Sequence, residues 1–150
     1  MAALFVSFTL HPAPSKLEGF RLPDFFEPLH YPCVLLPRDF FSYIVDTLRW
    51  IPTPSGKKID DPLGLHIIDK SGARIASSIF SAWSTLFTNA PSELQLTGPF
   101  CFGNALYEGQ YRALRFNRDT LREDLNNLSR YCELVEKENY ILVIFEYTRY

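Results

Sequence analysis

The clearest structural signal in the chain is the run NRDTLREDLNNLSRYCELVEKENYILVIFEY at residues 117–147. Within it, apolar residues recur in steps of 4, 3, 4 and 3, at Leu121, Leu125, Leu128, Cys132 and Val135. This spacing places them on one face of a helix, and charged residues occupy the opposite face. Asn117 is suited to cap the beginning of the helix and Asn139 its end, so we predict a helix of about twenty residues.

The segment after this helix, Tyr140–Tyr147, is apolar at nearly every position. Strands that are covered on both faces show such a continuous pattern, so we expect a central strand of the sheet. Another strand is expected directly before the helix, at Tyr111–Phe116. A strand, a helix and a strand in succession predict a parallel pair joined by a right-handed crossover.

Patterns of period two or of helical spacing predict the remaining elements. They are strands at Leu4–Leu10, Leu65–Asp69 and Leu94–Phe102, and a helix at Arg38–Trp50. The proline-rich residues 11–37 are interpreted as an irregular connection, held down by Leu22, Phe25 and Phe26. Residues 52–62 are expected to form a polar surface loop.

Residues 69–72, DKSG, have the composition of a tight turn. They predict a hairpin in which Ala73–Ser77 is the returning strand, followed by a short helix that ends near Asn89. A helix that runs from Gly72 onward is the alternative. Either way, the pattern predicts an α+β fold with a single mixed β-sheet, two to three helices and a C-terminal strand-helix-strand unit whose last strand is central.

The size and composition of the chain narrow the class of protein. Its 150 residues suit one globular domain, 1–150, and 47% hydrophobic residues can fill a core. With 15 Lys and Arg against 17 Asp and Glu, no basic face for nucleic acid is visible. The three cysteines form no CxxC pair, and no run of about 18 apolar residues could span a membrane, so a cytoplasmic protein is expected.

Motifs for a cofactor, a metal ion or catalysis are not visible in the sequence. The glycines are isolated, which argues against a nucleotide cofactor, and the three histidines stand far apart, which argues against zinc. A thiol enzyme would need Cys101 close to a histidine, His66 or His30, oriented by Asp69. We therefore expect no cofactor, no metal and no catalytic residue, and keep a small enzyme that uses Cys101, His66 and Asp69, or the carboxylates Asp60 and Asp61 with His66, as the alternative.

Residues 96–147, LTGPFCFGNALYEGQYRALRFNRDTLREDLNNLSRYCELVEKENYILVIFEY, resemble the C-terminal half of small immunity proteins of bacterial polymorphic toxin systems. The shared features are a strand that ends in RFN, a charged helix and an apolar last strand. The resemblance implies a non-enzymatic inhibitor that binds one cognate toxin domain and occludes its active site.

For such an inhibitor, acidic groups would meet a basic cleft and aromatic side chains would anchor the centre of the interface. The candidate partner-binding residues are Trp50, Asp60, Asp61, Tyr107 and Glu108. An adaptor subunit of a larger assembly is a third possibility, and it differs from the inhibitor in forming a stable hetero-oligomer.

Overall fold

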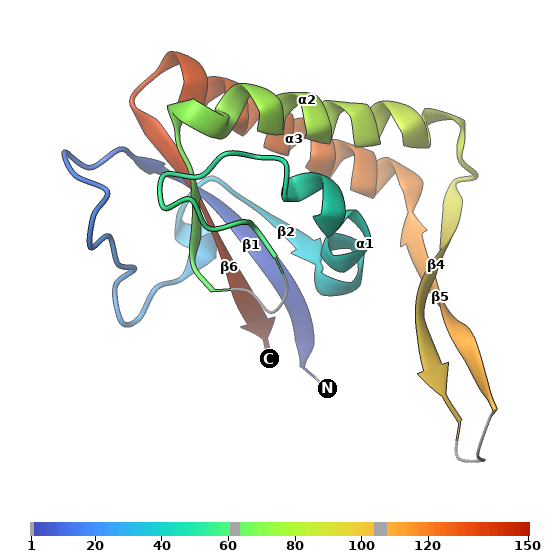
Figure 1. The fold of residues 1–150 in the computed structure, drawn as a ribbon. Coiled ribbons are helices and arrows are strands. Elements are labelled where there is room, and N and C mark those ends of the chain that lie inside the picture. Colours follow the sequence, from blue (N-terminus) through green and yellow to red (C-terminus); the bar gives the residue numbers. More distant parts are fainter. Residues whose placement is uncertain (1, 61–63, 104–107) are drawn as a thin grey trace.

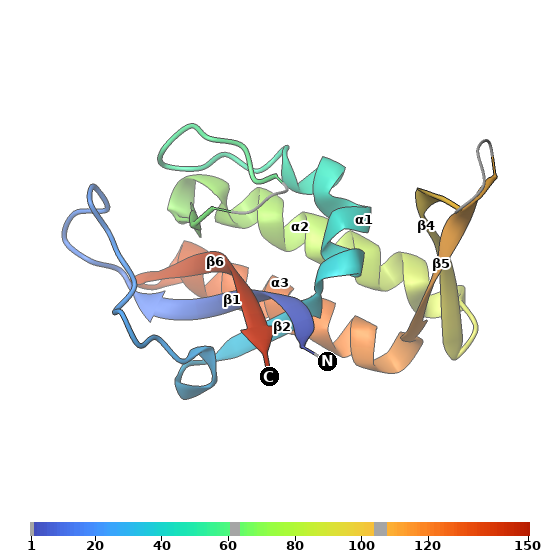
Figure 2. The same ribbon diagram turned by 90° about the horizontal axis from the view of Figure 1, so that it is seen from below.

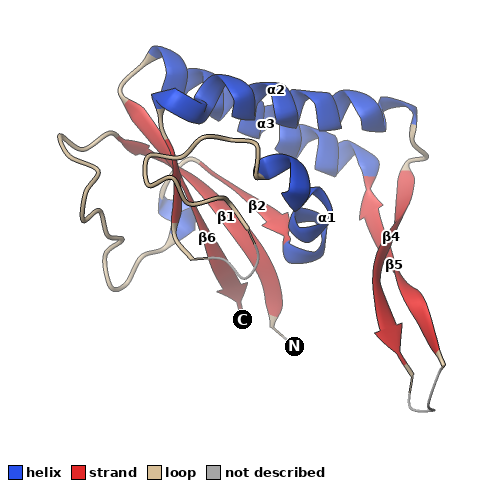
Figure 3. Ribbon diagram, viewed as in Figure 1, coloured by secondary structure: helices blue, strands red, loops and turns tan. Residues whose placement is uncertain are grey.

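A computed structural model of the chain describes residues 2–60, 64–103 and 108–150. Its elements follow the order β1 (Ala3–Pro12), β2 (Cys33–Pro37), α1 (Arg38–Leu48), β3 (His66–Ile68), α2 (Lys70–Leu86), β4 (Glu93–Phe102), β5 (Gly109–Asn117), α3 (Arg118–Lys137) and β6 (Tyr140–Arg149). Short 3-10 turns lie at Pro28–His30 and Phe87–Asn89. The expected α+β class is confirmed, with the strands in two antiparallel sheets (Figure 3).

The larger sheet has the strand order β2-β1-β6-β3. All three pairings are antiparallel, and β1 and β6 pair along their whole length, from Ala3 opposite Arg149 to Pro12 opposite Tyr140. The last strand therefore lies inside the sheet, as its continuous apolar pattern predicts. We call this sheet with its three α-helices the body.

The helices cover one side of the body sheet (Figures 1 and 2). Phe8 of β1 is fully buried there, with its ring centre 6.2 Å from that of Phe41 in α1 and 5.8 Å from that of Phe80 in α2. Leu125 and Leu128 of α3 are also fully buried. The helix α3 begins where predicted, because the side chain of Asn117 accepts the Thr120 N–H at 2.9 Å.

The other side of the body sheet is covered by the connection between β1 and β2. The His11 ring stacks on Tyr31 with 4.5 Å between centres, and Phe26 lies 5.1 Å from Tyr31 and 5.2 Å from Phe145. Beneath this aromatic cover, His11 Nε2 and Thr9 Oγ1 share a hydrogen bond of 2.7 Å, and burial lowers the pKa of His11. Both sides of the sheet are thus closed to solvent in its middle.

The predicted hairpin at residues 65–77 is wrong beyond its first strand. Residues 70–86 form one helix, the alternative reading, with Asp69 as its N-cap: its side chain accepts the Ser71 N–H at 3.0 Å. Asp and Ser favour both turns and N-caps, so the residues 69–72 fit either structure. Burial decides between them, because Ala73, Ala76 and Phe80 are fully buried on one side of the helix.

The single mixed sheet and the parallel strand pair are also wrong. The strand before α3, β5, pairs with β4 in a separate two-stranded sheet, so α3 joins two sheets and the two strands that flank it do not pair. In addition, the connection at residues 11–37 contains the edge strand β2, and Phe25 is fully exposed, whereas Phe26 packs in the aromatic cover.

Candidate functional site

The two-stranded sheet of β4 and β5 projects from the body as an arm (Figure 1). Its base is anchored: Leu94 and Leu114 are buried, and the Phe116 ring lies edge-on to Phe40 at 5.6 Å. Where the chain enters and leaves the arm, the Arg118 guanidinium donates to the Ala90 carbonyl at 2.8 Å. These contacts fix the direction in which the arm projects.

A β-bulge halfway along the arm changes which side its residues face. Thr97 lies opposite Ala113, but the next pair is Phe100 opposite Tyr111, so β4 uses three residues where β5 uses two. Paired residues in an antiparallel sheet lie on the same side, and successive residues along a strand lie on opposite sides. The extra residue therefore moves Phe100 to the side of Thr97 and Tyr111, away from the side of Leu94 and Leu114.

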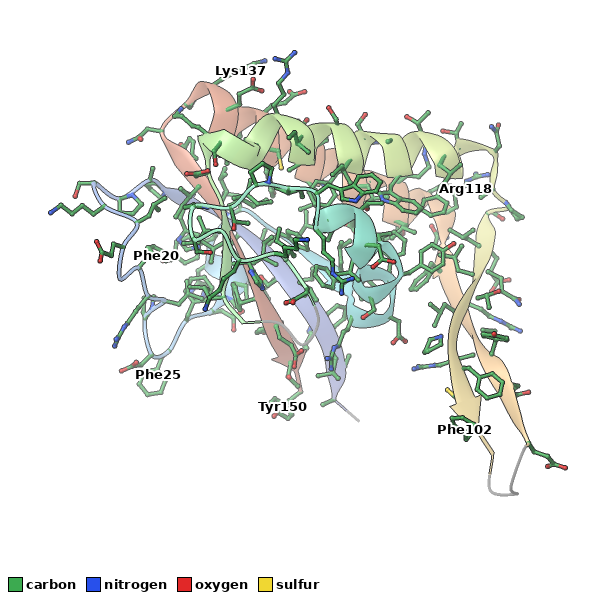
Figure 4. The ribbon with its side chains drawn as sticks, viewed as in Figure 1. Phe20, Phe25, Phe102, Arg118, Lys137 and Tyr150 are labelled. Carbon is green, nitrogen blue, oxygen red and sulfur yellow. The ribbon has the colours of Figure 1, made fainter. Side chains whose placement is uncertain are left out.

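Beyond the bulge, Phe100, Phe102 and Tyr111 form what we call the aromatic face of the arm. The Phe100 ring contacts both of the others edge-on, at 5.1 Å from Phe102 and 5.3 Å from Tyr111. Phe100 is 45%, Phe102 82% and Tyr111 67% exposed, and Figure 4 shows Phe102 near the far end of the arm. Nothing in the described body covers these rings.

Glycine opposite Phe102 makes room for this arrangement. A Cβ atom at Gly109 would lie 2.4 Å from Cζ of Phe100, closer than two carbon atoms can approach. The Phe100 ring therefore lies directly over the Gly109 backbone, which is how aromatic side chains compensate for a glycine within a strand. The aromatic face is a specific packing arrangement and not a chance exposure of three rings.

The aromatic face is large and uncharged. From the exposed fractions, its three side chains offer roughly 400 Å² of surface, which is about the size of the largest apolar patch on a typical monomer. Its neighbours on the same side of the arm, Thr97 and Ala113, carry no charge. Exposed patches of this kind mark interaction sites.

Behind the arm lies an open cleft of about 840 Å³ between β4–β5 and the body. Arg112 of β5 and Asp39 of α1 form an ion pair across it at 3.0 Å, and Arg38 pairs with Glu146 at 3.5 Å. Leu4, Tyr43 and Pro99 supply apolar lining. The Arg112–Asp39 pair therefore links the arm to α1 across the cleft.

The predicted partner-binding residues do not gather in one place. Trp50 is 68% exposed just after α1 and lines a shallow hollow against α2. Asp60 is exposed in the loop before β3, and Glu108 is exposed on the arm, where its carbonyl accepts the Gly103 N–H at 2.7 Å. Asp61 and Tyr107 lie outside the described residues.

The groups of the enzyme alternative are not brought together either. Cys101 is exposed on the arm, His66 lies in β3 at the edge of the body sheet, and Asp69 is engaged in capping α2. In Figures 1 and 2 the arm stands well apart from the green segment that leads into α2 and contains β3. Burial lowers the pKa of His66, and within the described residues its Nε2 has no hydrogen-bond partner.

Sequence reasoning missed the aromatic face, because Leu94–Phe102 was interpreted as a strand of the main sheet. The available signal is Gly98-Pro99, because a glycine and a proline within a strand indicate a bulge or an edge. The consequence of such a bulge is the change of side that exposes Phe100 and Phe102.

Comparison with known proteins adds no family: no family model matches the chain, and neither curated proteins nor solved structures gave a match. Within residues 2–60, 64–103 and 108–150, no helix is both long and apolar enough to cross a membrane. No cluster of three metal-binding side chains occurs in the same ranges.

Proposed function

We propose that this protein is a non-enzymatic inhibitor that binds another protein, an immunity protein whose partner is a cognate bacterial toxin domain. The aromatic face of the arm carries this proposal. Phe100, Phe102 and Tyr111 stand on a projecting sheet whose base is anchored, so they can enter a recess of the partner at little cost in conformational entropy. The sequence resemblance of residues 96–147, which include the arm except for its first residues 93–95, supports the toxin as partner.

The arm provides the means of inhibition. Large aromatic side chains at the centre of an interface contribute most of its binding energy, while the surrounding contacts exclude water. A standard interface takes about 800 Å² from each partner, so the aromatic face would supply about half of it. An arm inserted in the mouth of a toxin active site would block access of its substrate.

The partner-binding residues expected from the sequence have different places in this proposal. Glu108, near the aromatic face, would meet a cation of the toxin at the rim of the interface. Trp50 and Asp60 lie on the body and would contribute only where the partner is large enough to contact both the arm and the body.

Co-expression with the product of the adjacent upstream gene tests the proposal. In a bacterial host that this product alone kills, the wild-type protein should restore growth, and Phe102→Asp should lower affinity at least about 30-fold, as loss of a central aromatic does. Phe25→Asp is the matched control. Phe25 is also an exposed phenylalanine, but it lies in the β1–β2 connection and not on the arm.

The outcomes separate the two parts of the proposal. If the upstream product is harmless, or if the wild-type protein gives no protection, the immunity function is wrong. If wild type and Phe102→Asp protect equally well, the inhibitor acts through another surface and the role of the arm is wrong.

A further inference from the structure

The outer face of α2 carries almost no charge. Its exposed residues are Lys70, Ser71, Arg74, Ile75, Ser78, Ser81, Ala82, Thr85 and Leu86. After the first turn, Arg74 is the only charged residue among them. The neighbouring helix α3 shows the usual surface, with exposed Asp119, Glu123, Arg130, Glu133, Glu136 and Lys137. Depletion of charge distinguishes the centre of protein interfaces from ordinary surface.

Four apolar residues run along this face, and we call them the α2 stripe: Ile75, Ile79, Ala82 and Leu86. They follow one another in steps of 4, 3 and 4, so they lie on one side of the helix. Ile75 is 42% and Leu86 is 63% exposed. At the N-terminal end of the stripe, Trp50 and the helix enclose a shallow hollow of about 340 Å³.

The spacing of the α2 stripe is symmetric, because its steps are 4, 3 and 4 from either end. When a second α2 lies antiparallel to the first, Ile75 meets Leu86 of the second copy and Ile79 meets its Ala82. The same two contacts then recur on the other side of the two-fold axis. Next to that axis lie Ser78 and Ala82, whose small side chains allow two helices to approach closely.

We propose that the α2 stripe binds a second copy of this chain and forms a two-fold symmetric dimer with antiparallel α2 helices. Leu86 of each copy occupies the hollow beside Trp50 and Ile75 of the other. A two-fold interface requires a surface complementary to itself, and an exposed leucine at one end of a helix with a hollow at the other end satisfies this requirement. The dimer presents two arms, and its formation does not depend on the proposed inhibitory function.

The exposed area of the stripe predicts a moderate affinity. Ile75, Leu86 and Trp50 are large but only partly exposed, so the interface lies near the lower limit of about 1,000 Å² total for specific association. A dissociation constant in the micromolar range is expected. Sedimentation velocity from about 1 to 200 µM should show monomer converting to dimer.

Opposite charges introduced at the two ends of the α2 stripe test both the surface and its orientation. Ile75→Lys and Leu86→Glu should each weaken the homodimer at least about 30-fold, because each places two charges against apolar side chains. Mixed in equal amounts, the two variants should form a heterodimer, in which Lys at 75 of one copy meets Glu at 86 of the other and the second contact stays native. A parallel arrangement would bring 75 against 75 and allow no such rescue.

Phe102→Asp, an equally drastic change on the arm, serves as the control and should dimerise like the wild type. Circular dichroism of each variant confirms that the fold is retained. A wild-type protein that stays monomeric at 200 µM, single variants that still dimerise, or a mixture that fails to associate would each overturn the proposal. Variants that stay folded but lose only binding to the toxin would assign the stripe to the toxin, and would overturn it too.

Discussion

The two sheets of this protein use aromatic side chains in opposite ways. On the body sheet, Phe26 and Tyr31 lie over His11 and Phe145, and they close a sheet side that the helices leave open. On the arm, Phe100, Phe102 and Tyr111 pack against one another and are covered by nothing in the described body. The same residue types therefore stabilise the fold in one place and remain available for binding in the other.

The largest difference between the two regions should appear when one phenylalanine is removed from each. Phe8→Ala in the body core should lower the free energy of unfolding by about 4 kcal/mol, because it leaves a cavity between Phe41 and Phe80. Phe102→Ala on the arm should change it by less than about 0.5 kcal/mol. Urea denaturation of both variants checks this, and a large loss at Phe102 would contradict the interpretation that this ring is uncovered.

A smaller effect is expected where the aromatic face rests on glycine. Gly109→Ala places a Cβ against the Phe100 ring, so the ring must move, at a cost of about 1–2 kcal/mol. Gly64→Ala is the matched control, since no atom lies within 4 Å of the added Cβ. Thermal unfolding measures the cost, and nuclear magnetic resonance shows whether the disturbance stays within the arm. Equal stability of the two variants would mean that Phe100 does not rest on Gly109.

The smallest effect concerns α3, which joins the arm to the body. Burial, with Glu123 nearby, raises the pKa of Asp124 from 3.8 to about 6. The folded state thus holds this proton more tightly than the unfolded state, so ionisation of Asp124 destabilises the fold. Asp124→Asn should be more stable than wild type by up to about 1 kcal/mol above pH 6, after allowance for its partial exposure.

This gain should shrink as the pH falls from 6 towards 4 and vanish below that range, because Asp124 is then protonated in both states. Melting temperatures of the variant and the wild type at pH 7.5, 5 and 3.5 measure this change. Asp24→Asn, in the exposed β1–β2 connection, is the control and should leave stability unchanged. A variant less stable than wild type at pH 7.5 would show that the carboxylate makes a favourable contact.

The sequence predicted those elements whose residue pattern is set by burial on the body. The buried apolar face of α3 and the continuously apolar β6 correspond to a helix packed on one side and a strand covered on both, and the structure confirms each. The edge strand β2 was missed because Pro32 directly precedes it and Pro37 is its last residue, and prolines at the ends of an edge strand look like those of a loop.

The candidate surfaces were harder to predict, since they depend on how elements combine. From the sequence alone, Phe100 and Phe102 look like core residues. The bulge in β4 turns them outward, and only the pairing with β5 shows that bulge. The α2 stripe could not be predicted because the first half of the helix was assigned to a turn and the strand Ala73–Ser77. Trp50 and Glu108 are both exposed, yet nothing in the sequence shows that they belong to different surfaces.

The pairing of β1 with β6 also makes this chain suitable for circular permutation. Ala3 lies opposite Arg149, so a linker of a few residues can join the two ends without changing the sheet. New ends opened at Ser15–Lys16, in the exposed connection, would emerge on the side of the molecule away from the arm (Figure 1). A tag or surface attachment placed there would leave both the arm and α2 unobstructed.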